Sequence, residues 1–228
     1  MMNVNMSYND RRVQKAVNIY SKPLLWVYDF IVYQLATPYM LHCPADLILE
    51  HYNENIRPNH LDVGVGTGCL LKGCKQLKDI KRLGIMDLNP NSLEKSKQLL
   101  NEQHPEVYQA NILKPFETTA IDFDSIGMNY LLHCVPGNFE EKEVIFENLK
   151  EHLSKDGILF GCTVLGKDIN NALHTKLFLK LYQWIGIFNN AEDTHTGLKK
   201  SLSRHFTYYE VNVVGNVAFF RASDCSFL

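Results

Sequence analysis

The chain has 228 residues, of which 46% are hydrophobic and 21% charged, the balance of a globular protein rather than of a disordered or fibrous one. Its length favours one domain, residues 1–228, over two. The net charge of -2 gives no electrostatic reason to expect nucleic acid, so a small molecule is the favoured partner. The six cysteines contain no C-x-x-C pair, and we expect no metal site.

The N-terminal residues predict neither a secretory signal nor a membrane span. Residues 1–15 are polar and lack an apolar core, so we expect a cytoplasmic protein. Residues 23–41 have the length of a span, but Asp29, Gln34 and Pro38 would each be costly at the centre of a bilayer. We expect an apolar helix that lines a pocket instead.

A helical cap is expected over residues 1–56. The pattern from residue 9 to residue 50 predicts two or three helices, with breaks near Pro23, at Thr37-Pro38 and at Cys43-Pro44. This segment has no nucleotide-binding signature.

From residue 57 to residue 165 the pattern changes to alternating strands and helices, which we expect to form a cofactor-binding core. The predicted strands are 60–65, 82–87, 106–110, 123–128 and 157–163. The predicted helices are 69–77, 91–103 and 140–153. Asn89 or Asn91 is the expected N-cap of the second helix, and Lys155-Asp156 the turn before the last strand. Alternation of this kind is typical of a parallel sheet covered on both faces.

The C-terminal part is expected to differ. Residues 166–205 form a predicted helical insert, whose helices are 170–188 and 197–204. Two alternating runs then flank Gly215-Asn216, which is a hairpin signal, and they are 208–214 and 217–221. An antiparallel pair cannot continue a right-handed βα series, so residues 206–228 should close the edge of the sheet.

These elements together predict the fold class. We expect an α/β, Rossmann-like, mostly parallel seven-stranded sheet with helices on both faces, an antiparallel C-terminal hairpin and an N-terminal helical cap.

The strongest functional signal is the glycine run after the first strand. Gly64, Gly66 and Gly68 allow a sharp turn with positive φ, and they let a ligand approach the backbone with no Cβ in the way. A dinucleotide fingerprint has the spacing G-x-G-x-x-G, which would put Cys69 at the third small position. The spacing therefore disfavours NAD and FAD.

Asp87 ends the second strand, where a carboxylate can accept hydrogen bonds from ribose hydroxyls. A helix N-cap is the alternative role for this residue. Together with the glycine run, Asp87 gives the sequence a pattern that resembles the class I S-adenosylmethionine-dependent methyltransferases, in particular the small type 11 and type 12 enzymes. The resemblance covers roughly residues 60–163.

The resemblance implies S-adenosylmethionine as cofactor and a set of residues around it. These are Asp62, Gly64, Val65, Gly66, Gly68, Asp87, Leu88, Asn89, Asn111, Ile112, Asn129 and Tyr130. Asn111 departs from the family, which often has an acidic residue there, but its carbonyl oxygen can still accept a hydrogen bond from the adenine amino group. Asn129 taken alone is more often a loop asparagine than a ligand, and its place after the fourth predicted strand brings the two roles to about even.

Methyl transfer from a sulfonium is an in-line displacement, so it needs positioning more than a covalent nucleophile. His133 is the candidate general base, and a histidine packed in its loop is the alternative. The candidate substrate-binding residues are Tyr20, Tyr28, Tyr33, His133 and Trp184. An aromatic stripe at helical spacing is more often core than pocket, which is the alternative for the aromatic residues.

The favoured function is methylation of an O, N or C atom of a small, apolar or aromatic molecule. A protein methyltransferase and a non-catalytic binding subunit of the same fold are the alternatives. Base methylation is disfavoured because residues 129–132 are Asn-Tyr-Leu-Leu, not the Asp/Asn-Pro-Pro-Tyr/Phe motif of many enzymes that methylate bases.

Overall fold

The computed structural model describes residues 38–115, 121–169 and 172–227, and these form one seven-stranded sheet in the order β3-β2-β1-β4-β5-β7-β6. The strands are β1 (Asn59–Val63), β2 (Arg82–Asp87), β3 (Glu106–Gln109), β4 (Phe123–Asn129), β5 (Leu153–Val164), β6 (Tyr208–Val214) and β7 (Val217–Ser223). Strands β1 to β5 are parallel, and β7 pairs antiparallel with both β5 and β6. The predicted fold class and the closing hairpin are confirmed.

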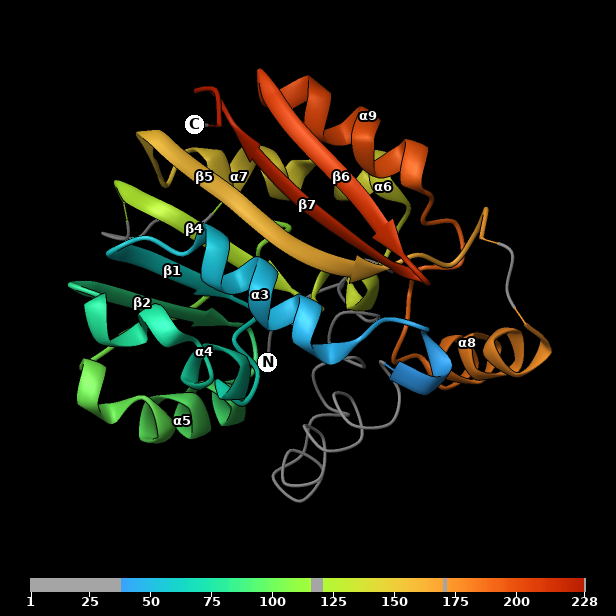
Figure 1. Ribbon diagram of the computed structural model, residues 1–228, viewed down its shortest axis with the longest axis horizontal. Coiled ribbons are helices and arrows are strands. Elements are labelled where there is room, and N and C mark those ends of the chain that lie inside the picture. Colours follow the sequence, from blue (N-terminus) through green and yellow to red (C-terminus); the bar gives the residue numbers. More distant parts are fainter. Residues whose placement is uncertain (1–37, 116–120, 170–171, 228) are drawn as a thin grey trace, which may run out of the picture.

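Helices cover both faces of the sheet (Figure 1). The α-helices are α3 (Ala45–Asn55), α4 (Cys69–Lys72), α5 (Pro90–Leu99), α6 (Phe139–Lys142), α7 (Val144–Lys150), α8 (Leu173–Ile185) and α9 (His195–His205). Short 3-10 helices are η2 (Lys75–Asp79), η3 (Asn101–Gln103) and η4 (Leu132–Cys134). Helices α3, α4 and α5 pack on one face, and α6, α7 and α9 pack on the other. The N-terminal helices expected before residue 38 lie outside the described residues.

Several predicted elements differ from the structure, among them the helix expected at 91–103, which ends at Leu99 and is followed by η3. The helix expected at 69–77 ends at Lys72, because Gly73 caps it and Cys74 is extended before η2. The helix expected at 140–153 is divided at Glu143 and ends at Lys150. The turn expected at Lys155-Asp156 lies inside β5, in the stretch where the pairing register with β4 shifts.

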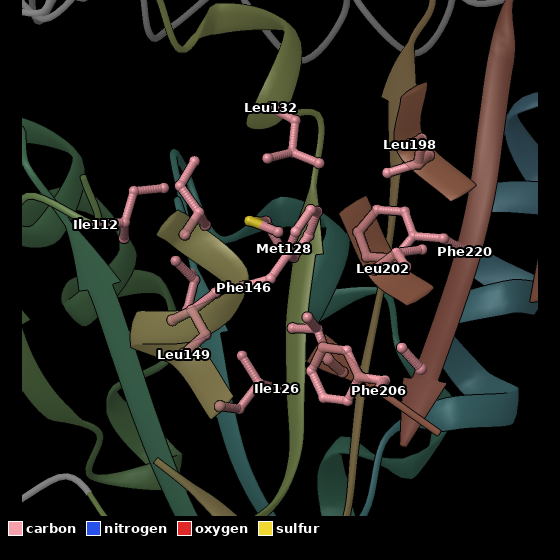
Figure 2. Packing of buried hydrophobic residues seen from close by; sticks show 14 of the residues in the cluster. Ile112, Ile126, Met128, Leu132, Phe146, Leu149, Leu198, Leu202, Phe206 and Phe220 are labelled. Atoms are coloured by element: carbon pink, nitrogen blue, oxygen red, sulfur yellow. The ribbon is translucent and has the colours of Figure 1, made fainter. Parts of the chain in front are cut away.

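The alternation of β1 places its side chains in two different layers. Leu61 and Val63 face the helices α6, α7 and α9, where they join a continuous apolar cluster. Figure 2 shows this cluster, with Met128 of β4 beside Phe146 of α7 and Phe220 of β7. Replacing a buried phenylalanine there by alanine should cost roughly 3–5 kcal/mol, because the cavity cannot collapse fully.

Helix α8 lies at the end of the sheet, away from both layers (Figure 1). It ends at Gly186, whose φ of 84° allows the left-handed C-cap, and it buries Thr175 and Leu179. In the part of the chain that the structure describes, no helix has both the length and the apolar character to cross a membrane.

Candidate active site

The glycine turn follows β1 directly. Gly64, Gly66 and Gly68 have φ values of 69°, 55° and 79°, which side chains rarely adopt. The backbone N–H of Gly64 donates to the carbonyl oxygen of Met86 at 2.7 Å, so the turn is fastened to β2. A Cβ on Gly66 would meet nothing closer than 3.9 Å, so this glycine faces open space. At Gly66 the turn therefore presents bare backbone to open space, whereas an added Cβ at Gly64 would meet Leu131 and one at Gly68 would meet Ser96.

Asp87 holds the turn from the end of β2. Its Oδ2 accepts from the backbone N–H of Gly66 at 3.1 Å, and its Oδ1 accepts from that of Asn89 at 2.8 Å. Burial raises the pKa of Asp87, against these backbone hydrogen bonds, which lower it. The N-cap of α5 is Asn89, whose side chain accepts from the N–H of Asn91. Asp87 is thus no N-cap, and each of its oxygens keeps a second lone pair.

The end of β4 carries two features that cost free energy. Both side-chain amide atoms of Asn129 are buried and have no hydrogen-bond partner among the described residues. Tyr130 has a φ of 54°, a left-handed conformation that costs a bulky residue about 1–3 kcal/mol. Its N–H is held by the carbonyl oxygen of Cys162 at 2.8 Å. Unpaired buried amides and backbone strain together are typical of ligand sites.

These two segments meet where the order of the strands reverses. Strand β1 pairs with β2 on one side and with β4 on the other, which makes the carboxyl ends of β1 and β4 the topological switch point. A Cβ on Gly64 would lie 2.8 Å from Cδ2 of Leu131, so the glycine turn and the segment after β4 are in contact. Ligands of open α/β sheets bind at this point.

The other expected cofactor residues, which follow β1, β2 and β3, offer few free side-chain polar groups. The Oδ1 of Asn111 accepts from the N–H of Leu113 at 3.1 Å, which leaves one lone pair for a ligand. The side chains of Val65 and Ile112 are buried in the two hydrophobic clusters, and Figure 2 shows Ile112 in one of them. The carbonyl of Leu88 accepts from Nε2 of Gln109 at 3.3 Å. Val65 and Ile112 therefore offer mainly backbone to the space above the sheet.

Asp62 is the remaining expected cofactor residue of β1, and its side chain faces α3. The carboxyl group is almost fully buried. Burial raises its pKa to about 7, while a hydrogen bond from Tyr52 lowers the value and the charge of Asp87 raises it. Near neutral pH, Asp62 is therefore poised between its two protonation states.

His133, the expected base, is buried in η4. Its Nδ1 accepts from the backbone N–H of Val164 at 3.3 Å. Burial, with a smaller contribution from Lys142, lowers its pKa to about 3. The ring of Phe188 packs edge-on at 4.7 Å. The imidazole is thus neutral and fixed, with its proton on Nε2.

Of the five expected acceptor-binding residues, the structure describes His133 and Trp184. Tyr20, Tyr28 and Tyr33 lie outside the described residues. Trp184 stands on α8 with 81% of its surface exposed.

Sequence reasoning missed a buried ion pair beside His133. The Nζ of Lys142 on α6 lies 2.6 Å from Oδ2 of Asp193, and both side chains are fully buried. Burial raises the pKa of Asp193 to about 6, although Lys142 lowers it. Asn189, in the same segment, donates its N–H to the carbonyl of His133 at 2.6 Å. The hydrogen bond of Asn189 therefore holds the segment after α8 against η4, and the ion pair of Asp193 holds the same segment against α6.

Among residues 38–115, 121–169 and 172–227, no group of three or more His, Cys, Asp or Glu side chains could hold a metal ion.

The strand order and the glycine turn at the switch point define the class as a Rossmann-like methyltransferase fold. The type 12 methyltransferase family model, described as "Methyltransferase domain", matches residues 61–159. Demethylluteothin O-methyltransferase from Streptomyces thioluteus is 32% identical over 203 residues, which cover 89% of this chain and 88% of that protein. The N-methyltransferase vrtF from Penicillium aethiopicum is 37% identical over 182 residues, which cover 78% of this chain and 75% of that protein.

A solved structure described as a DhpI–SAH complex has the same fold, with a TM-score of 0.65 at 15% identity, and it covers 95% of this chain and 97% of that one. The chain belongs to the S-adenosylmethionine-dependent methyltransferases. It is accordingly an enzyme that uses S-adenosylmethionine as methyl donor.

The residues present fit this cofactor. The open side of Gly66 leaves room for it, and the unpaired amide of Asn129 offers both a donor and an acceptor. The carboxylate of Asp87 lies beside the glycine turn and keeps lone pairs that could accept hydrogen bonds from a hydroxyl group.

Proposed function

We propose that the enzyme methylates an oxygen or nitrogen atom of a small, apolar or aromatic molecule. The observation that carries this proposal is the kinship to relatives named as an O-methyltransferase and an N-methyltransferase, at 32% and 37% identity. The Rossmann-like core with its glycine turn supports the same reading of the chemistry.

The geometry at the switch point supports the following proposed roles. In this proposal Asp62, Gly64, Gly66 and Gly68 border the methionine part, and Asp87 accepts hydrogen bonds from the ribose hydroxyls. When bound, the cofactor supplies a methyl group on a sulfonium, which the acceptor atom displaces in line. The buried side-chain amide of Asn129 forms its missing hydrogen bonds with the cofactor. Leu88, Asn89 and Asn111, with the backbone of Val65 and Ile112, border the adenine and ribose side.

His133 enters this proposal as a fixed, neutral ring rather than as a mobile base. Its Nδ1 already accepts a hydrogen bond from the N–H of Val164. The protonated Nε2 therefore remains to donate a hydrogen bond to the molecule that is methylated. Positioning of the acceptor supplies the rate enhancement, since an oriented pair of reactants needs no covalent nucleophile.

The domain plan is part of the proposal. We assign residues 1–56 to the cap, 57–165 to the cofactor core, 166–205 to an insert over the acceptor and 206–228 to the closing hairpin. The ion pair of Lys142 and Asp193, which fastens the insert beside His133, supports the placement of the insert. All six cysteines are free thiols, which is typical of a reducing compartment and supports a cytoplasmic location.

A panel of small phenols, carboxylic acids and amines, incubated with the enzyme and S-adenosylmethionine, tests the acceptor class. Mass spectrometry should detect a methylated small molecule together with S-adenosylhomocysteine. Methylation of added proteins alone, with no small molecule methylated, would replace this proposal by the protein methyltransferase alternative.

The variant Gly66→Val tests the cofactor site. The branched side chain enters the space that Gly66 leaves open and is strained at a φ of 55°, so calorimetric titration should detect no binding of S-adenosylhomocysteine. The matched control is Gly73→Ala, because an added Cβ there meets only ordinary contacts, the nearest at 3.4 Å, and should preserve binding. Binding by Gly66→Val at the affinity of the parent would move the cofactor away from the turn.

A further inference from the structure

A chain of polar side chains crosses the otherwise apolar layer between β1 and α3. His60 and Asp62 share one face of β1, and they point toward Tyr52 in the last turn of α3. Their neighbours in this layer are apolar, among them Ile85 and Phe160. A buried polar group without a partner costs about 1–3 kcal/mol, so these side chains need one another.

The contacts form one continuous series. The N–H of Arg57 donates to Oγ of Ser125 at 2.9 Å, and this oxygen lies 2.9 Å from Nδ1 of His60. The Nε2 of His60 lies 2.7 Å from the hydroxyl oxygen of Tyr52. The Tyr52 hydroxyl in turn hydrogen-bonds the carboxyl group of Asp62.

The last member of the series, Asp62, determines which group donates in each hydrogen bond. An ionised carboxylate only accepts, so Tyr52 must donate its single proton to Asp62. The Tyr52 oxygen then accepts from Nε2–H of His60, and Nδ1 of His60 accepts from the hydroxyl of Ser125. Burial lowers the pKa of His60 to about 3, in agreement with a neutral ring that donates at one nitrogen and accepts at the other.

The packing around the imidazole preserves this arrangement. Phe160 stacks on the ring with centroids 5.9 Å apart. Gly127, the partner of Asp62 on β4, provides the room, because a Cβ there would lie 3.1 Å from Cε1 of His60. Tyr52 therefore approaches Asp62 from a fixed direction.

We propose that Tyr52, His60 and Ser125 are positioning residues that hold the Asp62 carboxylate ready for the ammonium group of the cofactor, and that they couple cofactor binding to the release of a proton from Asp62. This inference rests on the proposed function, which places Asp62 beside the methionine part.

The groups that face Asp62 set the pH range of this coupling. Tyr52 from α3 lowers its pKa, and Asp87 from β2 raises it, with burial as the largest effect and a resulting value of about 7. The thiol of Cys74 also faces Asp62, whose charge contributes to raising the pKa of that thiol. His60 adds no charge, because it is neutral.

The sign of the effect follows from linkage. In the unliganded protein the pKa of Asp62 lies above its ordinary value of 3.8, so ionisation of Asp62 lowers stability as the pH rises toward 7. A bound ammonium group favours the carboxylate, so binding expels the proton. Below pH 7 the affinity should therefore fall by up to about tenfold for each pH unit.

Calorimetric titration with S-adenosylhomocysteine between about pH 5.5 and 8, in buffers of different ionisation enthalpy, measures both affinity and proton release. The parent should release up to one proton per ligand below pH 7. Tyr52→Phe removes the hydrogen bond that lowers the pKa of Asp62. Its proton release should therefore extend to higher pH, and its affinity at pH 7 should be roughly tenfold weaker. Asp62→Asn should abolish this release and leave only the titration of the ligand.

The controls separate positioning from a structural role. Tyr209→Phe, at an exposed site on β6, should bind with the pH profile of the parent. Ser125→Ala, at the far end of the series, should shift the profile in the same direction as Tyr52→Phe by a smaller amount, and it decides the question where Tyr52→Phe does not fold. A loss of thermal stability with an unchanged pH profile in these variants would overturn the inference.

Failure of the proposed function would look different. A parent protein that binds S-adenosylhomocysteine with proton release but methylates no small molecule would contradict the acceptor class and leave the coupling intact. A parent that binds without proton release over this pH range would contradict the coupling alone.

Discussion

Two buried polar networks each contain a neutral histidine, but they are built differently. The one between β1 and α3 is called the cofactor half, and the one beside η4 is called the insert half. Under α3, the series from Ser125 through His60 and Tyr52 consists of uncharged groups and meets a charge only at Asp62. Beside η4, a fully buried cation and anion, Lys142 and Asp193, face each other at 2.6 Å. Burial lowers the pKa to about 3 for both His60 and His133.

The difference has an energetic meaning. When one member of the series of neutral groups is replaced, the hydrogen bonds to its two neighbours are lost, at about 1 kcal/mol for each bond between uncharged groups. A buried ion pair that loses one partner leaves a charge without compensation, which costs several times more. A substitution in the first network should therefore shift a protonation equilibrium at a small cost in stability. A substitution in the second should destabilise the attachment of residues 189–193 to α6 and η4.

The largest expected effect is on the ion pair. Lys142→Met should lower the free energy of unfolding by about 3–5 kcal/mol, because the carboxylate of Asp193 stays buried without its cation. Urea denaturation measures this loss. The double variant Lys142→Met/Asp193→Leu should regain most of the stability, since it leaves no buried charge.

Lys200→Met is the matched control for this comparison. Lys200 of α9 pairs at 3.0 Å with Glu140 of α6, the helix that also carries Lys142, but both side chains are largely exposed. Its loss should leave the unfolding transition close to that of the parent. Equal destabilisation by the two lysine variants would show that burial is not what distinguishes the pair.

An intermediate effect is expected at Asp87. Asp87→Ala should weaken the binding of S-adenosylmethionine by about 1.5–3 kcal/mol, the range for hydrogen bonds to a charged group, and it also frees the N–H of Gly66. Asp87→Asn keeps one acceptor oxygen and should lose less. Calorimetric titration of both variants is the measurement, and a dissociation constant equal to that of the parent would remove Asp87 from the ribose site.

The smallest effect is expected on the surface of α8. Trp184 is 81% exposed, so Trp184→Ser should change the free energy of unfolding by no more than about 0.5 kcal/mol and leave cofactor affinity unchanged. Steady-state kinetics then isolates any role toward the acceptor. A raised KM at constant kcat would place Trp184 at the acceptor, and clear destabilisation would contradict its exposure.

The cofactor half was largely predictable from the sequence, because its signals are local. The strand from Arg82 to Asp87 was predicted with the observed bounds, and the three glycines adopt the positive φ that their spacing indicated. Asn89 as the N-cap of α5 also follows from neighbouring residues. The alternation of side chains along a strand and the spacing of a glycine turn both depend on neighbouring positions. Such local patterns can be read from a single sequence.

The insert half was less predictable, because its contacts join distant positions. Lys142 and Asp193 are 51 residues apart, and nothing in either segment marks them as partners. The division of the helix at Glu143 is a second example, since residues 140–153 have no glycine or proline that would signal it before Gly157. The polar residues His60 and Asp62 in an otherwise apolar strand were the one signal that could have revealed the series under α3.

The fit between Gly127 and His60 has an evolutionary consequence. An added Cβ at position 127 would lie 3.1 Å from the imidazole, so a larger residue there requires the ring to shift by a few tenths of an ångström. Such a shift of the ring would alter the hydrogen bond by which His60 orients Tyr52. We therefore expect histidine at 60 and glycine at 127 to occur together in relatives that share this hydrogen-bonded series.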